Sequence, residues 1–104
     1  MTDLPTLQKE YIEWRTRELS GEPNEFVTAG KVCAEAGELM DATIKNSEIR
    51  NDGIDWEAEQ RKEMGDVLIS LLGAAWAKGW DLEEVASERW ATIKERKFAT
   101  RTAE

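Results

Sequence analysis

The chain has 104 residues, a length that suits one domain with a modest core. It carries 22 acidic and 14 basic residues, a formal net charge of −8, which argues against binding a nucleic acid polymer, because such binding needs a surplus of Lys and Arg. It contains no His, and this excludes most zinc sites and any acid–base mechanism that uses His.

Hydropathy and cysteine content indicate the cellular location of the protein. We find no apolar stretch that suits a signal peptide or a run of about 18 apolar residues that suits a membrane span. The single cysteine, Cys33, cannot form an internal disulfide, and its apolar neighbours predict a small core residue. We therefore expect a cytoplasmic protein without a membrane partner.

The first half of the chain predicts two helices. Pro5 suits the first turn of a helix that ends at residues 20–23, Ser-Gly-Glu-Pro. Asn24 can cap the start of a second helix that runs to about Asn46. Residues 47–55 contain Asn-Asp-Gly and predict a loop.

The second half predicts two more helices. Asp55 can cap the third helix, and Lys78 with Gly79 forms a typical helix end. Asp81 can cap a fourth helix that lasts to about Phe98.

No part of the chain shows the alternating pattern of a strand, so the predicted fold class is all-α. The short loop predicts that the two long middle helices form an antiparallel hairpin flanked by two shorter helices. Two short helices cannot cover so long a hairpin, so we expect an oligomeric bundle, a homodimer or homotetramer, rather than a monomer.

Two acidic pairs are the main candidates for chemistry: Glu35 with Glu38, and Glu63 with Asp66. Residues three apart share a helix face, so packing of the two middle helices would bring four carboxylates together. Such a cluster needs a cation, and a hard divalent cation prefers oxygen ligands. The alternative is a solvated helix surface, because acidic pairs are frequent in so acidic a chain, although the apolar neighbours of both pairs favour the site.

The segments around the acidic pairs resemble the MazG-like all-α nucleoside triphosphate pyrophosphohydrolases. The resemblance covers residues 25–98 and rests on the segments Glu35-Ala-Gly-Glu-Leu39, Lys62-Glu-Met-Gly-Asp-Val-Leu68 and Gly79-Trp-Asp-Leu-Glu83. It implies one such domain over residues 1–104.

The resemblance also implies an activity: Mg²⁺-dependent hydrolysis of nucleoside or deoxynucleoside triphosphates to the monophosphate and pyrophosphate, with water attacking the α-phosphorus. Glu35, Glu38, Glu63 and Asp66 would then be the metal ligands and catalytic residues, with Mn²⁺ able to replace Mg²⁺. Glu35 is our candidate for the base.

Substrate binding needs cations for the phosphates and a surface for the base. Lys31 and Lys45 share the helix face of the first acidic pair. Arg89, Lys94 and Arg96 form a basic group late in the fourth helix, where the resemblance implies phosphate contacts. Trp14 is the candidate for stacking on the base. The alternatives are a soluble surface for the cations and core or subunit contacts for the tryptophan.

Two alternative functions stay open. A sister enzyme of the same architecture would act on dUTP or dCTP, or on phosphoribosyl-ATP. A protein of another class would be a non-catalytic helical interaction protein whose acids are surface residues.

Overall fold

The computed structural model describes residues 1–19 and 21–96, and within these ranges it contains four α-helices and no strand. The predicted all-α class is confirmed for this part of the chain. The helices, in chain order, are α1 (Leu4–Glu18), α2 (Glu25–Asn46), α3 (Trp56–Ala77) and α4 (Leu82–Ile93). None of the helices described is both long and apolar enough to cross a membrane.

Side-chain caps set the helix starts at the predicted residues. The Asn24 side chain accepts hydrogen bonds from the first amides of α2, and Asp55 and Asp81 do the same for α3 and α4. Each cap satisfies amides that have no partner within the helix. Gly79 follows the C-terminal cap of α3 with a φ of +71°, which a residue with a side chain rarely adopts. The helix therefore ends at the predicted Lys78 and Gly79.

The end of α4 differs from the prediction. The helix ends at Ile93 rather than near Phe98, which lies outside the described residues. The amide of Arg96 donates to the carbonyl of Ile93 at 3.0 Å, a tighter turn than an α-helix makes. Residues 94–96, Lys-Glu-Arg, are all charged and exposed, so no apolar packing favours continuing the helix.

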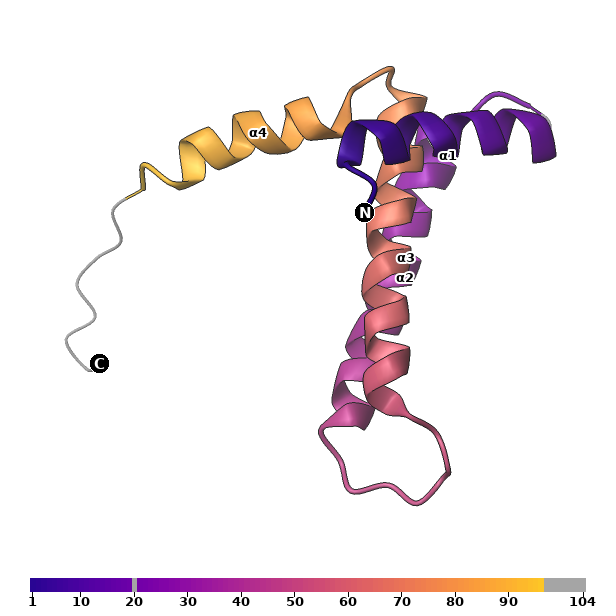
Figure 1. The fold of residues 1–104 in the computed structure, drawn as a ribbon, viewed down its shortest axis with the longest axis vertical. Helices are drawn as coiled ribbons and strands as arrows, with labels where there is room; N and C mark the ends of the chain where they lie inside the picture. The colour runs from indigo at the N-terminus through magenta and orange to yellow at the C-terminus, as the bar shows by residue number, and fades with distance from the viewer. Residues whose placement is uncertain (20, 97–104) are drawn as a thin grey trace.

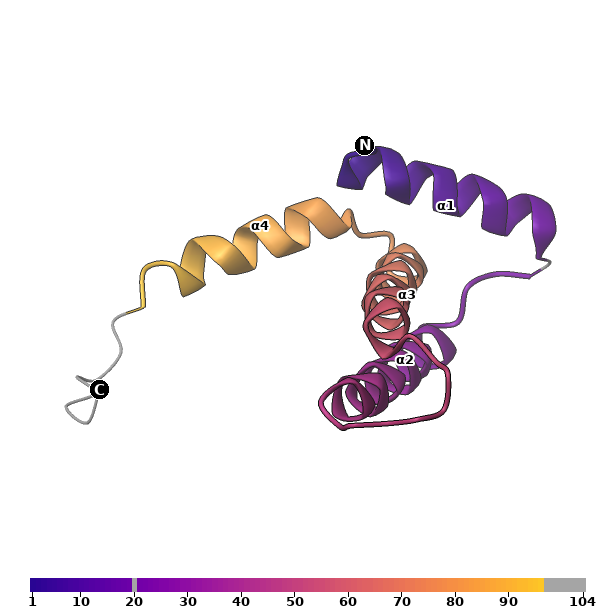
Figure 2. The same ribbon diagram turned by 60° about the horizontal axis from the view of Figure 1, so that its bottom comes forward.

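The helices α2 and α3 lie side by side along their lengths, joined by the loop at one end (Figures 1 and 2). The helix α1 crosses the opposite end, where α2 begins and α3 finishes (Figure 1). The helix α4 contacts α1 and α3 near its start and then extends away from the α2–α3 pair (Figure 2).

Two contacts hold α1 against the end of α3 and the start of α4. Gln8 Nε2 donates to the carbonyl of Trp80 at 2.9 Å, and Gln8 Oε1 accepts from the Leu82 amide at 2.8 Å. One turn later, Tyr11 lies so close to Gly73 that a Cβ there would be 2.7 Å from the phenol oxygen. Only glycine allows this approach, so Gly73 sets where α1 crosses.

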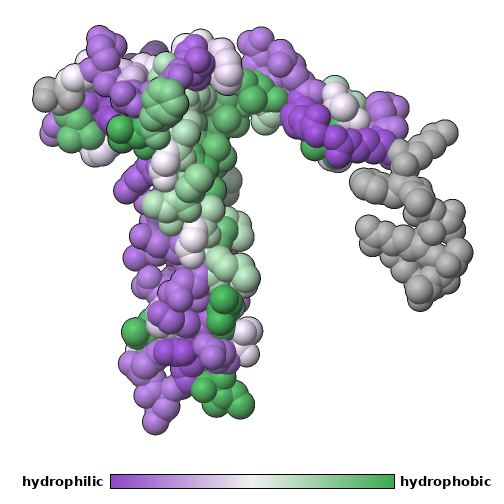
Figure 3. Space-filling view, turned by 180° about the vertical axis from the view of Figure 1, so that it is seen from behind, coloured by the Kyte–Doolittle hydropathy of each residue, from purple (hydrophilic) through white to green (hydrophobic). Residues whose placement is uncertain are grey.

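The single chain buries little apolar surface. Among the described residues the buried apolar side chains are Ala42, Leu72 and Ala75, and Cys33 is exposed, so its predicted core position is wrong. Figure 3 shows apolar side chains in a band along one side of the α2–α3 pair. Phe26 and Met40 of α2 are 80% and 60% exposed.

The overall dimensions agree with this open arrangement. The radius of gyration is 17.2 Å, whereas a compact domain of this length has about 13 Å. The accessible surface is 8213 Å², against about 5,900 Å² for a compact monomer of the same mass.

Candidate metal centre and adjoining cleft

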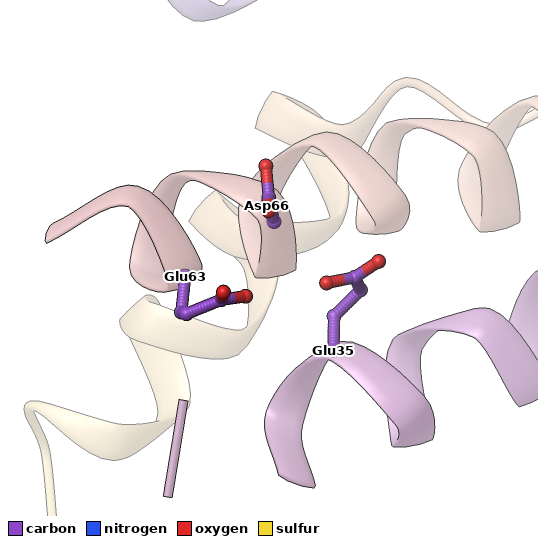
Figure 4. A group of neighbouring side chains, drawn as sticks. All are labelled: Glu35, Glu63 and Asp66. Atoms are coloured by element: carbon purple, nitrogen blue, oxygen red, sulfur yellow. The ribbon is translucent and has the colours of Figure 1, made fainter. Parts of the chain in front are cut away.

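Three of the four predicted carboxylates come together between α2 and α3. Glu35, Glu63 and Asp66 each offer an oxygen, and these atoms lie within 4.8 Å of one another. Figure 4 shows the carboxyl groups of Glu35 and Glu63 turned toward each other, with Asp66 beside them. Glu35 is 8% exposed, and the two acids of α3 are partly buried.

Two oxygens of this cluster have no hydrogen-bond partner. Both Glu35 Oε2 and Glu63 Oε2 are buried and unsatisfied. A buried charged oxygen without a partner is strongly unfavourable, and most buried polar atoms in proteins have one. The donor set consists of carboxylate oxygens alone, which suits Mg²⁺. The residues therefore fit a divalent cation, which would satisfy both oxygens and relieve the repulsion.

Glu38 lies beside this group on the exposed side of α2. Repulsion from Glu35 raises the pKa of Glu38, and the nearby Glu35 and Glu63 side chains add to this by sharing a proton with it. The fourth carboxylate is therefore electrostatically part of the cluster, although it does not share the close spacing of the other three.

Lys31 is the cation nearest the cluster. Its Nζ lies 3.1 Å from Glu35 Oε1, one helical turn away. Hydrogen bonding and attraction to Glu35 raise the pKa of Lys31, so the ammonium is held in its charged form. This pair uses one oxygen of Glu35 and leaves Oε2 directed at the other acids.

Lys45 lies in a different environment. Its Nζ is 2.9 Å from Asp41 and 4.7 Å from the ring centroid of Trp56. It follows Glu35 by ten residues, which is about 15 Å along a helix. It therefore belongs to the loop end of the α2–α3 pair and not to the surroundings of the carboxylates.

The basic residues of the fourth helix are also separate from the cluster within one chain. Arg89 lies on α4, Lys94 caps its end and Arg96 follows. All three are exposed, and α4 points away from the α2–α3 pair (Figure 1).

A cleft of about 510 Å³ adjoins the carboxylates. Glu35, Asp66 and Lys31 line one part of it, and Trp14 and Arg15 of α1 line another. The position of Trp14 places the candidate base-stacking residue in the same cleft as the acids.

Arg15 and Tyr11 also line this cleft, and no motif in the sequence indicates a functional role for either. Their spacing of four residues puts them on one face of α1. Every packed helix has such a face, so the spacing alone does not indicate a cleft. Only the crossing of α1 over Gly73 brings the pair to the cleft.

Comparison of the chain with family models, with curated proteins and with solved structures finds no match. The assignment of a function therefore depends on the residues and their geometry. Chemically, the site combines a carboxylate cluster that fits a divalent cation with a cleft bearing cations and aromatic rings.

Proposed function

We propose that this protein is a Mg²⁺-dependent nucleoside triphosphate pyrophosphohydrolase of the MazG-like kind. The observation that carries the proposal is the cluster of Glu35, Glu63 and Asp66, two of whose buried oxygens have no partner. A surface group of acids would not bury unsatisfied oxygens, because water would solvate them. The adjoining cleft supplies the room for a nucleotide.

The cluster and the cleft have complementary tasks in this reaction. Glu35, Glu38, Glu63 and Asp66 would hold Mg²⁺, which would polarise the phosphoryl group. The Lys31 ammonium attracts the phosphates. Trp14 offers a ring on which the base stacks.

The hydrolysis is a displacement at the α-phosphorus. The oxygen of water forms a bond to this atom, the bridging bond to the β-phosphate breaks, and pyrophosphate leaves. Glu35 accepts the proton of the water, since the chain has no His for this role. The monophosphate is the second product.

We further propose that the α2–α3 pair is an antiparallel hairpin at the centre of an oligomeric bundle. The excess surface of about 2,300 Å² per chain, relative to a compact monomer, is in the range that obligate homodimers bury. A second copy could also bring Arg89, Lys94 and Arg96 to the phosphates. Light scattering at micromolar concentration should give the mass of a dimer or tetramer, and a monomer mass would contradict the bundle.

The test of activity is a panel of canonical and modified nucleoside triphosphates, including dUTP, dCTP and phosphoribosyl-ATP, assayed for pyrophosphate with Mg²⁺ or Mn²⁺. We expect hydrolysis by the wild type and none by Glu38→Gln or Asp66→Asn, with helical circular dichroism retained. Full activity in both variants would refute the site. No activity and no stabilisation by Mg²⁺ with a non-hydrolysable nucleotide would favour the non-catalytic interaction protein.

A further inference from the structure

The wall that α1 contributes to the cleft carries an arginine in a fixed position. Arg15 Nη1 donates a hydrogen bond of 3.0 Å to Tyr11 Oη, and its guanidinium lies 5.9 Å from the ring centroid of Trp76. Tyr11 is itself held against Gly73. Two aromatic contacts therefore orient the guanidinium before any ligand arrives.

The α1 wall of the cleft has hydrogen-bond donors that no acceptor in the chain uses among the described residues. Arg15 takes part in none of the ion pairs among the described residues, and the bond to Tyr11 uses one of its five N–H groups. Because Tyr11 Oη accepts that bond, its own proton can be donated elsewhere. The α1 side of the cleft therefore presents donors without a matching acceptor.

The hydroxyl groups that α2 and α3 contribute to the cleft have no proton available for a ligand. Ser70 Oγ donates to the carbonyl of Val67 at 2.7 Å, and Thr28 Oγ1 donates to the carbonyl of Asn24 at 3.0 Å. Both protons are used within the helices, which leaves only lone pairs to face a ligand. The available donors in this part of the cleft thus come from α1.

We propose that Arg15 and the Tyr11 hydroxyl select nucleotides whose base carries a keto oxygen at C6 of a purine or at C4 of a pyrimidine: guanine, hypoxanthine, uracil and thymine. The inference rests on the proposed function, which places the triphosphate at Glu35 and Asp66. A base that extends along the cleft and stacks on Trp14 then turns its edge toward the donors of α1.

Base chemistry supplies the discrimination. A guanidinium donates two parallel bonds to O6 and N7 of guanine and donates to O4 of uracil or thymine. Adenine and cytosine place an amino donor at the corresponding position, so donor faces donor and one polar group is left unpaired. One good bidentate contact discriminates by about tenfold or more.

The experiment measures binding of the full-length protein, in Mg²⁺, to α,β-imido analogues of GTP, ATP, UTP and CTP by calorimetry. The wild type should bind the GTP analogue about tenfold more tightly than the ATP analogue, with the same direction for UTP over CTP. Arg15→Met and Arg15→Lys should both lose the preference, because neither retains the planar pair of donors. Tyr11→Phe should reduce it.

Arg17→Met is the matched control, because Arg17 lies on the same helix but pairs with Glu18 at 2.9 Å and is exposed. It should keep the wild-type preference. A thermal unfolding transition shows whether each variant is folded. If Arg15→Met does not fold, Arg15→Lys, which keeps the positive charge, still tests the loss of the planar pair of donors.

Binding of inorganic tripolyphosphate with Mg²⁺ separates this inference from the proposed function. Equal binding of all four analogues by the wild type, or an unchanged preference in both Arg15 variants, would overturn the inference and leave the function standing. Failure to bind tripolyphosphate or any analogue would overturn both.

Discussion

Replacing one buried acid of the cluster should stabilise the protein when no divalent cation is bound. Glu63→Gln removes one negative charge from three oxygens that lie within 4.8 Å of one another. At this spacing and an effective dielectric constant of about 20, two like charges repel by about 3.5 kcal/mol. Solvent screening and Lys31 reduce this repulsion, so we expect a net gain of about 1–2 kcal/mol in the free energy of unfolding.

The same variant should lose the stabilisation that Mg²⁺ gives to the wild type. A ligand that binds only the native state at 100 times its dissociation constant stabilises by about 2.7 kcal/mol. For a chain of this size, each kcal/mol shifts Tm by about 4–8 °C. In EDTA, Glu63→Gln should therefore melt about 4–16 °C above the wild type, and in saturating Mg²⁺ the order should reverse.

Thermal unfolding followed by far-UV circular dichroism, at one protein concentration with EDTA and with Mg²⁺, measures both effects. Glu10→Gln is the matched control, because Glu10 is an exposed acid of α1 outside the cluster. It should change neither value by more than about 0.5 kcal/mol. If Glu63→Gln melts below the wild type in EDTA, or if Mg²⁺ raises the Tm of both by the same amount, the reasoning about the unsatisfied oxygens is wrong.

Three further predictions concern contacts outside the carboxylate cluster. Gly73→Ala places a Cβ 2.7 Å from Tyr11 Oη and should destabilise by about 1–3 kcal/mol, and adding Tyr11→Phe should recover part of this loss in the same melting assay. Gln8→Ala leaves a buried carbonyl and amide without partners and should speed hydrogen exchange throughout α1, whereas unchanged exchange would show that this contact does not dock the helix. The bond from Trp56 Nε1, with help from Arg50, lowers the pKa of Asp52 to about 2. Since the folded pKa is below the ordinary 3.8, the stability that Asp52 contributes is present above pH 3.8 and is lost as the pH falls through about 2. Asp52→Asn should remove this acid-dependent part of an unfolding titration, and an identical titration would contradict the assignment.

The ends of the helices could largely be predicted from the sequence, because their causes are local. Asn24, Asp55 and Asp81 accept from amides two or three residues away, and Gly79 adopts a backbone conformation that few other residues tolerate. The end of α4 was predicted too late: residues 94–96 are exposed and lack the packing that supplies most of the stability of a helix in a protein.

The candidate site was only partly accessible to the same reasoning. The spacing of Glu35 with Glu38 and of Glu63 with Asp66 placed each pair on a helix face, which is a property of a single helix. Which oxygens become buried without a partner depends on how α2 and α3 pack, so Glu38 could not be distinguished from Glu35 in advance.

The sequence by itself determined four helices, their caps and two acidic faces, since each depends on residues within a turn or two of one another. Only the tertiary structure decided that Cys33 is exposed and that Arg15 lines the cleft beside Trp14. These positions depend on contacts between residues far apart in the chain, above all the approach of α1 to Gly73. Helical periodicity shows which residues share a face, but the partner of that face is set by packing.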